Sequence, residues 1–163
     1  MTNGRSSVDA VWSQSVRDED VVQQGLVSAS ALLDLIKAFE SVRLDVVWTT
    51  GVELKFPLAV LRLALQAYCL ARRLIYREVV GQATFTTSAI LAGGGFATDM
   101  LALLLHKTLT RLRYELPRVH LYVIVDDLTI RTERRPGEAA SILTRATRQC
   151  IQELEGELDM KVS

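Results

Sequence analysis

Three aspartates stand where a polypeptide chain could hold a divalent cation. Asp126 and Asp127 directly follow residues 119–125, a β-branched, apolar segment typical of an interior strand. Asp34 lies near the end of residues 28–35, where small and apolar residues alternate with polar ones as in a half-buried strand. A carboxylate there is costly unless it is solvated, paired or bound to a cation. If the two strands are neighbours, the three carboxylates converge on one site.

Such a cluster fits magnesium and phosphoryl transfer. Mg²⁺ prefers carboxylate oxygens together with substrate phosphates. Two such ions, about 3.5–4 Å apart, can stabilise both oxygens of an in-line displacement. Two plainer interpretations stay open, because aspartates also favour turns, and Asp34 could cap a helix that begins near Lys37.

The remaining periodicity predicts the elements that position these residues. Gly93-Gly94-Gly95 interrupts the pattern directly before an apolar helix. The sequence predicts helices over residues 8–25, 37–48, 57–73, 96–114 and 139–154, strands over 28–35, 119–125 and 128–132, and a hairpin of 74–80 and 83–87 that turns at Gly81-Gln82.

Size and composition limit the classes of protein that this chain can represent. It has 163 residues, and 19 Lys and Arg balance 19 Asp and Glu, so one domain without an overall electrostatic field is expected. The longest apolar run, residues 89–105, contains Asp99 and three glycines and does not fit a membrane span. Cys69 and Cys150 have no partner at metal-ligand spacing, and no secretory signal opens the chain, so both are expected to be reduced, buried and intracellular.

Three segments together resemble one enzyme family. Residues 33–42 (LDLIKAFESV), 89–100 (AILAGGGFATDM) and 122–130 (YVIVDDLTI) resemble, in order and spacing, three motifs of the palm region of reverse transcriptases of the non-LTR retrotransposon type, which are RNA-directed DNA polymerases. The similarity extends over roughly residues 8–163.

The resemblance implies an α+β fold, a ferredoxin-like polymerase palm with an antiparallel sheet backed by helices. Part of the fingers is expected and no thumb, so the partners include the missing fingers and thumb segments of a parent protein. Residues 1–163 are then expected to be a single, truncated palm domain. Within it, residues 1–27 form an N-terminal helix region, and residues 28–163 form the palm with partial fingers.

The resemblance also implies template-directed DNA synthesis on RNA, with an RNA template, a DNA primer and dNTPs as partners. Its cofactors would be two Mg²⁺ ions, for which Mn²⁺ can substitute, and its compartment the nucleus or the cytoplasm. The implied metal-binding and catalytic residues are Asp34, Asp126 and Asp127, with the Leu35 backbone beside the metal. The implied nucleotide- and template-binding residues are Phe39, Gly93, Gly94 and Gly95.

Departures from the family pattern keep two alternatives open. Ile124 occupies the position of the family's tyrosine, and Ala92 stands where many relatives have glutamine. A catalytically degenerate palm remnant is one alternative. The other is a non-enzymatic α+β domain with accidental motifs, which predicts that Asp34 lies far from Asp126-Asp127. Phe39 could equally be a core aromatic, and the glycines a flexible loop.

Overall fold

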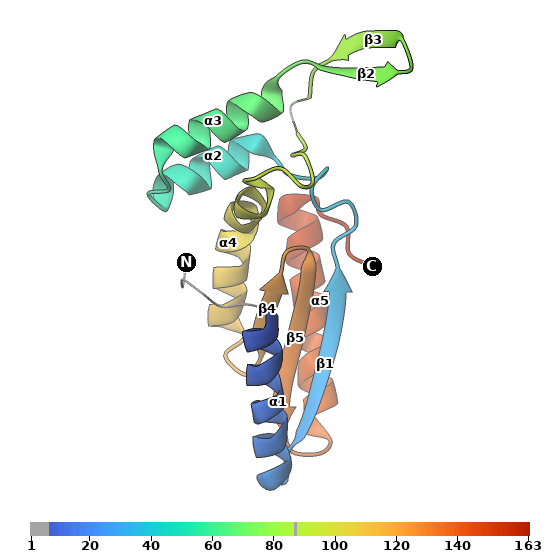
Figure 1. The fold of residues 1–163 in the computed structure, drawn as a ribbon. Coiled ribbons are helices and arrows are strands. Elements are labelled where there is room, and N and C mark those ends of the chain that lie inside the picture. The colour runs from blue at the N-terminus through green and yellow to red at the C-terminus, as the bar shows by residue number, and fades with distance from the viewer. Residues whose placement is uncertain (1–6, 87) are drawn as a thin grey trace.

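Helices and strands are mixed along the chain, which is α+β as predicted (Figure 1). The computed structural model describes residues 7–86 and 88–163. Residues 1–6 of the predicted N-terminal region and Thr87 of the predicted strand 83–87 lie outside the described residues. The elements are α1 (Ser7–Gln23), β1 (Val27–Asp34), α2 (Leu44–Glu53), α3 (Leu58–Cys69), β2 (Arg72–Tyr76), β3 (Val79–Thr84), α4 (Ala97–Glu115), β4 (His120–Ile124), β5 (Asp127–Arg134) and α5 (Glu138–Leu158).

Strands β1, β5 and β4 form an antiparallel sheet in that order. β4 and β5 are joined by the two-residue turn Val125-Asp126, which fixes their register. β1 pairs with the other edge of β5. The last residues of the chain return to β1, where Val162 forms an antiparallel bridge with Leu35.

The returning segment, residues 161–163, lies on the edge of β1 away from β5. The Leu35 N–H points to Asp126 of the β4–β5 turn, whereas the carbonyl of Asp34 accepts a hydrogen bond from Ser163 N–H at 3.0 Å. These two groups belong to one peptide unit, and in a trans peptide they point in opposite directions. The observed order across the sheet is therefore residues 161–163, β1, β5, β4.

The hydrophobic core lies between the sheet and α4 and α5, and it continues where α2 packs against α3 and α4 (Figure 1). Leu33, Leu128 and Ile130 point into it from the sheet, as period-two alternation predicts. α5 contributes residues at helical spacing, Ala146, Cys150, Leu154 and Leu158.

The two cysteines differ in environment. Cys150 is buried as predicted, and burial, helped by nearby Glu153, raises its thiol pKa to about 12. Cys69 is exposed at the C-terminal end of α3, so the prediction that both are buried was wrong for this one.

The predicted helix 37–48 begins later than expected. Backbone turns occupy residues 36–41, where Ala38 N–H donates to Leu35 O at 3.2 Å and Lys37 has a φ of 53°. Only from Leu44 does α2 form. The apolar residues of this segment are spaced as in a helix, but the chain leaves the end of β1 through these turns and the helix starts only after them.

The hairpin turn was also misplaced. It lies at Arg77-Glu78, and Arg77 adopts a φ of 53°. Gly81 is in β3 instead, where an added Cβ would lie 3.3 Å from the carbonyl oxygen of Leu74. A glycine suits this position because the backbones of the two strands approach closely here, and not because the chain turns.

Two glycines permit a matched test of helix packing. A Cβ on Gly51 of α2 would lie 2.7 Å from Cδ2 of Leu61, whose side chain is fully buried in α3. Overpacking costs about 1–3 kcal/mol and outweighs the 0.5–1 kcal/mol of helix propensity that Ala gains over Gly. We therefore expect Gly51→Ala to lower the free energy of unfolding by about 1–2 kcal/mol.

Gly156→Ala in α5 is the control, because no atom lies within 4 Å of its added Cβ. It should stabilise the chain by roughly 0.5–1 kcal/mol. Urea denaturation of both variants measures the difference. Equal changes of the same sign in the free energy of unfolding of the two variants would contradict the tight α2–α3 crossing.

Candidate functional site

The sheet places Asp34 and Asp127 directly opposite each other. They are cross-strand partners at the ends of β1 and β5. Asp126 precedes Asp127 in the β4–β5 turn, and its carbonyl oxygen lies 3.4 Å from the Leu35 backbone nitrogen. Residues more than 90 positions apart in the sequence thus meet at one end of the sheet. The accidental-motif alternative predicted the opposite, that Asp34 is remote from this turn.

Asp34 and Asp127 project from the face of the sheet opposite α4 and α5. Directly paired residues of an antiparallel sheet share a face, and the next pair inward, Leu33 and Leu128, is buried in the core. Leu32, two residues before Asp34 on the aspartate face, is 77% exposed. This part of the face is therefore open to solvent and to a large partner.

The turn that carries Asp126 is strained. Val125 has a φ of 60°, a left-handed conformation that is a genuine outlier for a β-branched residue. Such strain costs about 1–3 kcal/mol and is concentrated at functional sites. The turn sets both the β4–β5 register and the position of Asp126, so the strain falls at the predicted site.

The donor set at this end of the sheet suits magnesium. Asp34, Asp126 and Asp127 offer carboxylate oxygens, and the Leu35 carbonyl accepts a hydrogen bond from Ala38 N–H at 3.2 Å. Within residues 7–86 and 88–163, however, no group of three or more His, Cys, Asp or Glu side chains is arranged to hold a metal ion. The backbone brings the three aspartates to one end of the sheet, but their side chains do not converge.

Phe39 and the glycine run form a second neighbourhood. Ile90 N–H donates to Phe39 O at 2.9 Å, which joins the segment before the glycines to the segment after Asp34. Phe39 is partly buried against the hydrophobic core, as the core-aromatic interpretation expects. Gly93 has a φ of 81°, and a Cβ on Gly94 would lie 3.2 Å from the Tyr68 hydroxyl. A Cβ added to Gly95 would have no heavy atom within 4 Å.

Helix α1 packs on the aspartate-bearing face, a feature that periodicity did not predict. Arg131 of β5 is buried on this face, and its guanidinium pairs with Asp18 of α1 and with Glu133. Its Nε lies 3.1 Å from Glu133 Oε1 without hydrogen-bond alignment, so this contact is an ion pair only. Arg17 also donates to the Tyr122 hydroxyl of β4.

This network lies at a distance from the aspartates. Arg131 pairs with Ser30, four residues along β1 from Asp34, which is roughly 13 Å at the usual rise of a strand. The signal that could have revealed it is an arginine within the predicted strand of residues 128–132, whose other members are Leu, Ile and two Thr residues.

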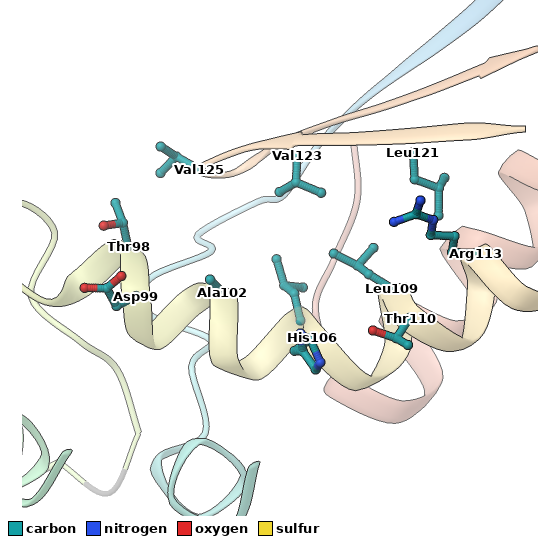
Figure 2. Close-up of a pocket in the computed structure, with 11 residues that line it drawn as sticks. Thr98, Asp99, Ala102, His106, Leu109, Thr110, Arg113, Leu121, Val123 and Val125 are labelled. Carbon is teal, nitrogen blue, oxygen red and sulfur yellow. The ribbon is translucent and has the colours of Figure 1, made fainter. Parts of the chain in front are cut away.

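A hollow of about 550 Å³ lies between α4 and the edge strand β4 (Figure 2). Figure 2 shows Asp99 near the Val125 end and Arg113 near Leu121. The apolar residues of β4 that line it are on the face opposite Asp34 and Asp127. The hollow is therefore separate from the predicted site.

No protein-family model matches the chain, and no curated protein matches it. None of the helices in the described part of the chain is long and apolar enough to cross a membrane.

Proposed function

We propose that this chain is a polymerase palm of the reverse transcriptase type, which carries out template-directed DNA synthesis on RNA with Mg²⁺ and dNTPs. The observation that carries the proposal is the pairing of Asp34 with Asp127 beside Asp126. These aspartates belong to the two sequence motifs in which the family has its metal-binding acids. Random motif matches do not require the two segments to meet.

The topology supports the same proposal. Strand β1, helix α4, strands β4 and β5, helix α5 and residues 161–163 follow in the order of a ferredoxin-like unit. The order across the sheet, with both helices on one face, also agrees with that arrangement. α2, α3 and the β2–β3 hairpin are inserted between β1 and α4, where partial fingers are expected.

The roles of the side chains follow from their positions. Asp34 and Asp126 would be the principal ligands of two Mg²⁺ ions, with Asp127 as the third acid and the Leu35 backbone facing the nucleotide. When bound, the ions lower the charge of the triphosphate and activate the primer 3′-hydroxyl. Phe39 would border the sugar of the nucleotide, and the glycines would let backbone approach the base pair closely. The exposed face beside Leu32 gives the primer end access.

Primer extension tests the proposal. The purified chain is incubated with an RNA template, a labelled DNA primer, dNTPs and Mg²⁺ or Mn²⁺. Elongation that requires both template and metal is expected. Absence of elongation under every metal condition would contradict the proposal.

A catalytically degenerate palm remnant is the second candidate. It is favoured by the lack of a converged ligand group among the described carboxylates and by Ile124 and Ala92 at motif positions. A remnant keeps the fold and shows neither elongation nor carboxylate-dependent metal binding.

A further inference from the structure

The β2–β3 hairpin extends away from the rest of the chain (Figure 1). Its strands pair with each other, and no other described helix or strand packs extensively against either. We call residues 72–85 the arm. Exposed apolar side chains cover both of its faces, Leu74, Ile75, Tyr76, Val79, Val80 and Phe85. A two-stranded hairpin is marginally stable alone in water, so this surface fits a partner.

The charge distribution identifies the chemistry of that partner. Residues 54–96, which contain α3, the arm and the glycine run, carry five Lys and Arg and a single acid, Glu78, for a net charge of +4. The chain has no net charge, so the remaining residues carry −4. The arm therefore lies in the positive part of a strongly asymmetric molecule. A polyanion is the complementary partner.

The aromatic side chains limit further which class of polyanion fits the arm. The Arg77 guanidinium lies over the Tyr76 ring, 5.4 Å from its centroid. Phe85 is 75% exposed and Tyr76 is 66% exposed, so the Phe85 ring and the Tyr76 face turned away from Arg77 are available for stacking. Arg73 is exposed on β2, whereas Arg72 is half-buried and donates to the Tyr68 carbonyl. Exposed aromatic faces interleaved with arginine side chains are the pattern that binds unpaired bases and their phosphates.

We propose that the arm binds single-stranded RNA, with bases stacked on Tyr76 and Phe85 and phosphates held by Arg73 and Arg77. The choice of RNA rests on the proposed function, whose template is RNA. A duplex keeps its bases stacked on one another and cannot use exposed rings in this way. A protein surface would match the aliphatic residues of the arm, but it does not account for the concentration of positive charge.

Fluorescence anisotropy with a labelled 12-nucleotide single-stranded RNA tests the proposal on the whole chain. Stacking contributes about 1–3 kcal/mol per base, so Tyr76→Ala with Phe85→Ala should weaken binding at least tenfold. Arg73→Glu with Arg77→Glu should weaken it and reduce the salt slope by about 1.4, at about 0.7 per phosphate contact. Tyr114→Ala on α4, which removes another exposed ring, and Arg145→Glu with Arg148→Glu on α5 are the matched controls. These controls should bind as the unmodified chain does.

Several results would overturn the proposal. They are RNA binding unchanged in both arm variants, equal losses in the controls, or no binding by the unmodified chain. Binding of duplex as tight as that of single strand would also overturn it. A dimer that only the arm variants dissociate, with RNA affinity unaltered, would assign the arm to a protein contact. Ultraviolet cross-linking of bromouridine RNA should map to residues 72–85, a readout that does not depend on the variants folding.

The test separates this inference from the proposed polymerase activity. Asp126→Asn should retain RNA binding while it removes elongation. If both arm variants still elongate the primer and bind RNA with unchanged affinity, only the proposal that the arm binds RNA is rejected. If the unmodified chain binds RNA through the arm but does not elongate a primer, only the polymerase proposal is rejected.

Discussion

Asp126→Asn should reduce metal-dependent primer extension at least ~10³-fold. The substitution removes one negative charge from a site that must hold two divalent cations, and it leaves the side chain nearly the same size. Metal stabilisation of a phosphoryl-transfer transition state is worth several kcal/mol, and roughly each 1.4 kcal/mol is tenfold in rate. Steady-state incorporation of a single dNTP measures the effect.

Asp20→Asn is the matched control for this prediction. Asp20 is exposed on α1, where its carboxylate accepts a hydrogen bond from Gln24 that asparagine can keep. The Asp20→Asn variant should incorporate a dNTP at the same rate as the unmodified chain. An Asp126→Asn variant that retains full activity would show that the Asp34–Asp127 end of the sheet does not perform the chemistry.

Arg131→Ala should lower the free energy of unfolding by about 2–4 kcal/mol. Removal of one partner of a buried ion pair costs roughly 3–5 kcal/mol, because the other charge is left buried. The cost here is smaller since the Asp18 side chain is 53% exposed and can be solvated, although Glu133 is only 20% exposed. The loss also removes a side chain that joins α1 to the centre of the sheet.

Urea denaturation, with the midpoint compared at an unchanged slope, measures this loss. Asp18→Asn is the companion variant, and it should cost about 1–2 kcal/mol, because buried Arg131 keeps Glu133 as an ion-pair partner and the asparagine oxygen can still accept its hydrogen bond. Amide hydrogen exchange should rise first in α1 in both variants. A larger cost for Asp18→Asn than for Arg131→Ala would contradict the central role given to Arg131.

The sequence predicted the elements whose pattern is strong. The alternation in residues 28–35 placed Asp34 near the end of β1, which ends at that residue, and the long apolar helix of residues 96–114 corresponds closely to α4. Those patterns reflect burial against a core, which is the dominant free-energy term in folding. The meeting of Asp34 with Asp127 required the motif resemblance, because periodicity does not specify which strands pair.

Other features depend on tertiary contacts that one-dimensional patterns do not contain. Gly81 was expected in a turn, but it permits close backbone approach to Leu74 within the hairpin. The positive φ of Val125 follows from a two-residue connection and not from the preference of valine. Arg131 is buried because α1, more than 100 residues earlier in the chain, supplies Asp18.

Binding of Mn²⁺ by the purified chain, followed by electron paramagnetic resonance in the presence of a dNTP, tests most directly whether Asp34, Asp126 and Asp127 share divalent ions. Saturable binding is predicted for the unmodified chain and for Asp20→Asn, and its loss is predicted for Asp34→Asn and for Asp126→Asn. Binding that is absent from the unmodified chain, or equal in all four proteins, would contradict a shared metal site at the Asp34–Asp127 pair.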